Sequence, residues 1–183
     1  MLVPGNVTYS DAVTGTQKAT IFSTSMCRDF NLEKLRNGCK SRVKLNKFPG
    51  KLAKHFQTYV KAHMPEDSPD VVLIQAGGND LRTKDTPIEI AQSIIEAGIE
   101  CKNLGAMKVL ISSVLPRSDF HLQLKRHAVN QLLQGLCEIH NFIFISNDFL
   151  KLSKHICYDG VHWNEMGTVL LQNTFMQFLN MNV

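Results

Sequence analysis

The sequence lacks the features that would place it in a membrane or mark it for secretion. Its 183 residues contain no apolar run close to the roughly 20 residues that a transmembrane helix needs. The first residues, MLVPGNVTYSDAV, lack the basic start and apolar core of a secretory signal, so we expect none. The five cysteines form no CxxC pair and their number is odd, which favours reduced thiols in a cytoplasmic protein over a disulfide framework.

Acidic residues are missing from one long stretch. Between residues 34 and 54 the chain carries eight basic side chains and no acidic one. They are Lys34, Arg36, Lys40, Arg42, Lys44, Lys47, Lys51 and Lys54. Such a surface suits the phosphate backbone of RNA or an anionic membrane, and a solvated surface without a partner is the alternative interpretation.

The length and composition are those of one soluble globular domain. Hydrophobic residues make up 44% and charged residues 20% of the chain, and 183 residues suffice for a single well-buried core. We therefore expect one domain over residues 1–183, with an irregular lead-in at 1–17, where Pro4, Gly5 and Gly15 interrupt any regular pattern. The sequence fits either a complete protein or a fragment of a longer one.

Strand patterns alternate with helix patterns along the chain. Apolar segments predict strands at 19–22, 42–45, 70–76, 107–114 and 142–145. Helical spacing predicts helices over 27–37, from about 51 to 63, over 87–105, over 120–139 and over 164–179. Continuous apolar runs are typical of strands buried on both faces of a parallel sheet. The fold class is therefore α/β, with an approximately five-stranded parallel sheet in a three-layer α/β/α sandwich.

In such sheets ligands bind beyond the carboxyl ends of the strands. The last of these loops contains Asp159-Gly160-Val161-His162. A carboxylate three residues before a histidine can reach the histidine Nδ1 in a tight loop, and this contact fixes the ring as a base. Taken alone, however, such a pair is more often a coincidence on the surface.

Two other loops carry groups that a hydrolase needs. Ser25 follows the first strand, at a predicted helix start where a backbone N–H can bind an anion. Asn79 follows the third strand after two glycines, and its amide can donate to an oxyanion. An N-cap serine and a turn-forming asparagine are the structural alternatives. The joint placement of these groups at one sheet edge favours a catalytic role over these structural ones.

These segments resemble the SGNH (GDSL-like) hydrolase superfamily. The matches are IFSTSMCRDF with Ser25, FPGKL with Gly50, AGGNDLR with Asn79, and DGVHWNEMG with Asp159 and His162. The resemblance implies a flavodoxin-like SGNH hydrolase fold and a serine esterase with Ser25 as nucleophile, His162 as base and Asp159 as its orienter. It also implies an oxyanion hole from the backbone N–H groups of Ser25 and Gly50 with the Asn79 side chain. No metal or organic cofactor is implied.

The resemblance covers about residues 19–180 and departs from the family at one place. The family's first block is usually Gly-Asp-Ser, whereas this chain has Ser23-Thr24-Ser25. The segments SMCRDF, FPG, GGNDLR, ISSVLPR and DGVHWNEMG resemble in particular the esterase domain of the first open-reading-frame protein of some vertebrate LINE retrotransposons. That resemblance implies a longer parent protein that self-associates outside this fragment and acts with element RNA.

The residues leave other functions open. A catalytically weak SGNH-like module that binds nucleic acid or anionic membrane is the main alternative to an esterase for small acyl or lipid esters. A parallel sheet also permits an FMN-binding protein, with Ser23-Thr24-Ser25 as its phosphate loop.

Several single residues carry alternatives of their own. Cys27, two residues after Ser25, is a candidate thiol nucleophile. His155 and Cys157 with Asp159 and His162 are a weak candidate metal cluster. Further residues near the predicted site are Arg82, Arg117 and Trp163. The arginines are candidates for contact with an anionic substrate or for salt bridges, and Trp163 for walling the acyl pocket or packing beneath the closing helix.

Overall fold

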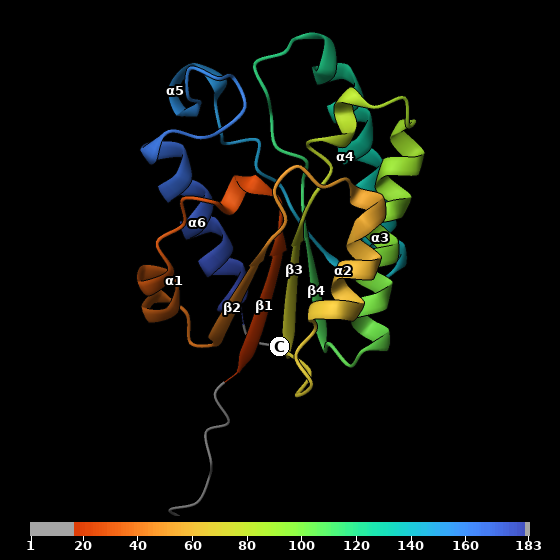
Figure 1. Ribbon diagram of the computed structural model, residues 1–183, viewed down its shortest axis with the longest axis vertical. Helices are drawn as coiled ribbons and strands as arrows, with labels where there is room; N and C mark the ends of the chain where they lie inside the picture. The colour runs from red at the N-terminus through yellow and green to blue at the C-terminus, as the bar shows by residue number, and fades with distance from the viewer. Residues whose placement is uncertain (1–16, 182–183) are drawn as a thin grey trace, which may run out of the picture.

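The computed structural model describes residues 17–181, and the predicted lead-in lies, apart from Gln17, outside the described residues. Its centre is a five-stranded sheet with the order β2-β1-β3-β4-β5 (Figure 1). Every neighbouring pair is parallel, as predicted. The strands are β1 (Lys18–Ser23), β2 (Arg42–Lys47), β3 (Val71–Gln75), β4 (Lys108–Ser112) and β5 (Ile143–Ile145).

Helices cover both faces of the sheet. The α-helices are α1 (Leu32–Gly38), α2 (Phe56–His63), α3 (Pro87–Asn103), α4 (His121–Ile139), α5 (Leu152–His155) and α6 (Glu165–Leu179). Three short 3₁₀ turns follow the first three strands: η1 (Ser25–Cys27), η2 (Ala53–His55) and η3 (Asp80–Arg82). Among the helices of the described residues, none combines the length and apolar character needed to span a membrane.

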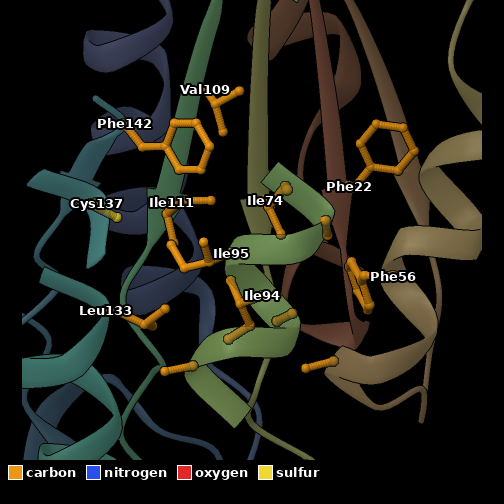
Figure 2. Packing of buried hydrophobic residues seen from close by; sticks show 14 of the residues in the cluster. Phe22, Phe56, Ile74, Ile94, Ile95, Val109, Ile111, Leu133, Cys137 and Phe142 are labelled. Atoms are coloured by element: carbon orange, nitrogen blue, oxygen red, sulfur yellow. The ribbon is translucent and has the colours of Figure 1, made fainter. Parts of the chain in front are cut away.

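The alternation of side chains along each strand divides the core into two clusters. Even-numbered positions of β1 and β3, such as Phe22 and Ile74, pack with α2, α3 and α4. Figure 2 shows Ile74 of the sheet in one cluster with Ile94 of α3 and Leu133 of α4. Odd-numbered positions such as Ile21 pack with α1 and α6 on the opposite face. The strands are therefore buried on both sides, and the three-layer α/β/α sandwich is confirmed.

The ends of the long helices follow from local sequence. Thr86 and Glu89 form a capping box at the start of α3, and Pro87 occupies the first turn, where its missing N–H costs nothing. At α6 the side chain of Asn164 accepts a hydrogen bond from the backbone N–H of Gly167. The predicted starts of these two helices are confirmed to within one residue.

The helix predicted over 27–37 is wrong in its start. Only the single 3₁₀ turn η1 follows Ser25, closed by a bond from the Arg28 N–H to the Ser25 carbonyl. The α-helix begins at Leu32, because the Asn31 side chain accepts from the Lys34 N–H and caps it there. The sequence analysis also missed α5, which has only four residues.

The carboxyl ends of all five strands lie at one edge of the sheet, uppermost in Figure 1. The chain moves from β1 to β2 on one side and later to β3 on the other. The end of β1 is therefore the switch point of the topology, where α/β sheets bind ligands. Ser25 lies two residues beyond that end.

Candidate active site

The structure brings together Ser25, His162 and Asp159, three residues that the sequence analysis selected. The Ser25 Oγ lies 3.2 Å from the His162 Nε2. The His162 Nδ1 lies 2.6 Å from the Asp159 Oδ2. Ser25 and His162 are 137 residues apart in the chain, so the fold alone creates this contact.

The loop that carries Asp159 and His162 is closed by the Asp159 side chain itself. Its Oδ1 accepts the backbone N–H groups of Val161 and His162, both at 2.9 Å. Gly160 takes a left-handed conformation with φ of 66°, which suits glycine. The Cys157 N–H donates to the His162 carbonyl at 2.7 Å and closes the base of the loop. Asp159 therefore shapes the loop with one oxygen and orients the imidazole with the other.

The hydrogen bonds favour the charged form of Asp159 and one tautomer of the neutral His162 ring. The bond from His162 and the two backbone N–H groups hold the pKa of the Asp159 carboxyl well below its ordinary range. A charged carboxylate at Nδ1 requires the proton of neutral imidazole to sit on Nδ1. Nε2 is then free to accept the Ser25 proton, which is the arrangement of a general base.

The loop after β4 holds the Asp159 loop in place. The Ser118 N–H and the Ser118 Oγ both donate to the Gly160 carbonyl, at 2.9 and 3.1 Å. A Cβ at Gly160 would occupy the space of the Ser118 hydroxyl. The sequence analysis missed this contact, because it joins two loops distant in the chain.

The candidate oxyanion donors belong to the loops after β1, β2 and β3. Within residues 17–181 the N–H groups of Ser25 and Gly50 donate to no other protein group. The Asn79 Nδ2 donates to the Lys51 carbonyl at 3.0 Å, and an amide nitrogen has a second hydrogen to offer. The contact from Asn79 also ties its own loop to the residue after Gly50.

A second tie between the same loops comes from Asp80. Both of its carboxylate oxygens accept the Ala53 N–H, at 2.9 and 3.1 Å. Asp80 is 2% exposed, and burial raises its pKa. The hydrogen bonds of Asn79 and Asp80 together hold the loop after β3 against the loop after β2, which gives both residues of the Asn-Asp pair a structural role.

The unusual residues of the first block turn inward. The hydroxyls of Ser23 and Thr24 both donate to the Gln75 Oε1, at 2.9 and 3.0 Å. Ser23 and Thr24 are fully buried. They therefore offer no hydroxyl to a phosphate, which argues against an FMN phosphate loop built on these two residues. The contacts of Ser23 and Thr24 with Gln75 instead hold the end of β1 against β3, just before Ser25.

Cys27 does not fit the role of a thiol nucleophile. It is completely buried, and burial raises the pKa of its thiol to about 12. A reactive thiolate requires the opposite shift. The hypothesis of a thiol nucleophile at Cys27 is therefore wrong, because the side chain packs in the core beneath η1.

The remaining candidates near the loop have structural contacts. The described part of the chain contains no group of three or more metal-ligating side chains placed to hold an ion. The His155 Nδ1 accepts the Lys151 N–H at 2.9 Å instead. Trp163 is buried against the closing helix α6. It also lines a cavity of about 480 Å³ between Asn31 and α6, which neither Ser25 nor His162 lines. Packing beneath the closing helix is therefore confirmed, and a wall of the acyl pocket stays a prediction.

Comparisons with known proteins identify the class of fold. No family model matches the sequence, and no curated protein matches it either. Solved structures do match. An acetylxylan esterase of Geobacillus stearothermophilus, a catalytic mutant, has a TM-score of 0.74 at 14% identity, covering 91% of this chain and 95% of its own. A lipase/acylhydrolase of Enterococcus faecalis has a TM-score of 0.74 at 16% identity, covering 90% and 95%.

A GDSL-like lipase of Bacteroides thetaiotaomicron has a TM-score of 0.70 at 16% identity and covers 90% of this chain and 88% of its own. The chain therefore has the α/β fold of the SGNH (GDSL-like) hydrolases. The predicted fold class is confirmed at this level. At these identities the likeness concerns the fold alone.

Proposed function

We propose that the chain is a serine esterase that hydrolyses small acyl, acetyl-type or lipid esters. The observation that carries this proposal is the unbroken hydrogen-bond chain from Ser25 through His162 to Asp159. The Ser25 Oγ attacks the ester carbonyl while the His162 Nε2 takes its proton. The protonated His162 then donates that proton to the departing alcohol, and Ser25 is left acylated.

Water completes the reaction by the same route. His162 removes a proton from a water molecule, which attacks the acyl carbonyl, and then returns a proton to the Ser25 Oγ as the acid leaves. In both steps the negative charge on the carbonyl oxygen is stabilised by the N–H groups of Ser25 and Gly50 and by the Asn79 amide. Asp159 stays ionised throughout and stabilises the imidazolium. The protein groups suffice for this chemistry, and it calls for no cofactor.

The solved neighbours support the proposal. Variants of the Geobacillus acetylxylan esterase at a serine, an aspartate and a histidine are described as catalytic mutants, and the histidine lies three residues after the aspartate. Asp159 and His162 of this chain have the same spacing. The resemblance of the sequence segments to SGNH hydrolases points to the same residues.

The proposal is tested by hydrolysis of p-nitrophenyl acetate. Ser25→Ala should lower kcat by about 10³-fold or more, because it removes the nucleophile. Ser153→Ala is the matched control: it removes an exposed hydroxyl of α5 and should leave the rate unchanged. Equal rates for wild type and Ser25→Ala would show that Ser25 is not the nucleophile.

A second candidate function is binding of RNA, with anionic membrane as the competing outcome. A cavity of about 340 Å³ at the edge strand β2 is lined by Lys18, Arg36, Arg42 and Lys44, with Asp67 as an acidic neighbour. Asp67 pairs with Lys18 at 2.9 Å, which leaves Arg36, Arg42 and Lys44 unpaired by acids within residues 17–181. Such a surface attracts phosphates.

This second function is tested with the full chain. Binding of a single-stranded RNA and of phosphatidylserine vesicles should be measured across salt concentrations, for wild type and for Arg42→Gln with Lys44→Gln. RNA affinity that falls with salt and with the double substitution supports RNA. Vesicle binding with no RNA binding supports the membrane, and the absence of both removes the second function.

We also propose a longer parent protein and a cytoplasmic location. The resemblance to retrotransposon esterase domains supports a parent protein that binds RNA and self-associates outside this fragment. All five cysteines are free thiols, three of them buried, which agrees with the proposed cytoplasmic location.

A further inference from the structure

Arg117, in the loop between β4 and α4, is a buried cation without an acidic partner. It is 3% exposed. Its Nη1 donates to the Gly78 carbonyl at 2.9 Å, and its Nε is buried without any hydrogen-bond partner among the described residues. Asp119 and Asp159 attract its charge from a distance, but neither forms an ion pair with it. An arginine is rarely buried so fully unless its charge is paired.

The guanidinium lies against the oxyanion loop, near the residue that follows the nucleophile. A methyl group added at Gly78 would lie 4.0 Å from the Arg117 Nη1 and 3.9 Å from the Met26 Cε. Met26 directly follows Ser25, and Gly78 directly precedes Asn79. Ser118, the next residue after Arg117, holds the Asp159 loop through Gly160. Arg117 therefore lies where the loops after β1, β3 and β4 come together.

A second arginine belongs to the same oxyanion loop. Arg82 ends η3, the 3₁₀ turn that begins after Asn79. Its side chain is exposed and makes no hydrogen bond or ion pair within the described part of the chain. Burial lowers the pKa of Arg117, and repulsion by Arg82 lowers it further. Two cations that repel each other, neither in an ion pair with an acid of the described residues, are an arrangement that a bound anion would relieve.

We propose that Arg117 and Arg82 form an anion subsite at the mouth of the active site, and that the ester substrate carries a carboxylate or phosphate group. This inference rests on the proposed esterase function and gives its substrate class. A guanidinium binds both anions by paired N–H donors. Arg82 offers the accessible donors, and Arg117 fixes the inner end of the subsite beside Gly78.

The test compares anionic esters with neutral partners of similar size. Methyl 4-acetoxybenzoate is the neutral ester, and 4-acetoxybenzoate and 4-acetoxyphenyl phosphate carry the two anions on the alcohol half. The monoester of glutaric acid with 4-nitrophenol carries a carboxylate on the acyl half, with 4-nitrophenyl pentanoate as its neutral partner. For each anionic ester, the measured quantity is the ratio of its kcat/KM to that of its neutral partner.

In the wild type, kcat/KM for at least one anionic ester should be about tenfold or more above kcat/KM for its neutral partner, because a hydrogen-bonded charge pair can stabilise binding by that much. Arg82→Gln and Arg117→Lys should each lower this ratio about tenfold, mainly through KM. Lys84→Gln is the matched control, because it removes an exposed charge two residues after Arg82. It should leave the ratio unchanged, whereas an equal fall in this control would indicate general attraction by the surface and overturn the subsite.

The remaining outcomes separate the subsite from the esterase. If neutral and anionic esters are hydrolysed alike and no arginine variant changes the ratio, the subsite is wrong and the esterase stands. If Arg117→Lys slows all esters equally and Arg82→Gln changes nothing, Arg117 only supports the Gly78 loop and the subsite is again wrong. If no ester is hydrolysed, calorimetry of the anionic esters on Ser25→Ala still decides: binding that Arg82→Gln weakens supports the subsite, and no binding refutes it.

Discussion

The substitution Asp159→Asn separates the two tasks that Asp159 performs. The Oδ1 atom accepts both backbone N–H groups of the loop, and Oδ2 alone contacts the His162 Nδ1. An asparagine can keep its carbonyl oxygen in the Oδ1 position and place its NH₂ group in the Oδ2 position. The loop then keeps its backbone bonds, while a donor replaces the acceptor that faces Nδ1.

The consequence for His162 is a change of tautomer. With a donor opposite, Nδ1 must accept, so the proton of the neutral ring moves to Nε2 and the ring can no longer take the Ser25 proton. We expect kcat to fall by about 10³ to 10⁴-fold, equivalent to about 4 to 5.5 kcal/mol of activation free energy. The free energy of unfolding should change by no more than about 0.5 kcal/mol, as for other surface substitutions, because the side chain is 49% exposed.

The assay is p-nitrophenyl acetate hydrolysis together with urea unfolding of each variant. Asp159→Ala is the control, since it removes both tasks: it should lower kcat and also lower the free energy of unfolding by about 1 kcal/mol. Because the asparagine would precede Gly160, deamidation can regenerate aspartate, and each sample needs a mass spectrum. If intact Asp159→Asn keeps more than a tenth of the wild-type kcat, the tautomer argument is wrong.

Two further predictions concern the neighbours of the triad. Gly160→Ala should lower the free energy of unfolding by about 2 kcal/mol and reduce activity, because φ is 66° and the new Cβ would displace the Ser118 hydroxyl. Urea unfolding measures the stability and kcat measures the activity. Wild-type values for both would contradict the prediction. Cys27 should resist alkylation by iodoacetamide at pH 8 in the folded protein, because burial raises its pKa to about 12. Mass spectrometry of the native and unfolded protein locates the label, and rapid labelling of native Cys27 would contradict its burial.

Local sequence was enough to predict the sheet and most of the helices. The run from Val71 to Gln75 is buried on both faces, and continuous apolar runs of this kind predict such a strand. The pairing of Asp159 with His162 followed from their spacing of three residues. The predicted start of α1 is wrong because the segment after Ser25 divides into the 3₁₀ turn η1 and a helix that the Asn31 side chain caps.

The contacts between loops could not be predicted. The role of Gln75 depends on the end of β1 lying beside the end of β3, and it joins residues 51 and 52 positions apart in the chain. The burial of Arg117 depends on loops from β3 and β4 meeting. Neither residue stands in a pattern of its own, so only the assembled sheet shows what each of them contacts.

The charged edge of the sheet has a consequence for the behaviour of the protein in solution. β2 lies at the outside of the sheet, and its residues Arg42, Lys44 and Lys47 are exposed. An uncovered edge strand can pair with the same strand of another molecule, and positive charges along it oppose such pairing. Neutral substitutions made there to test RNA binding would therefore also remove a barrier to aggregation. A loss of soluble protein in those variants would indicate that the positive charges of β2 prevent pairing between edge strands.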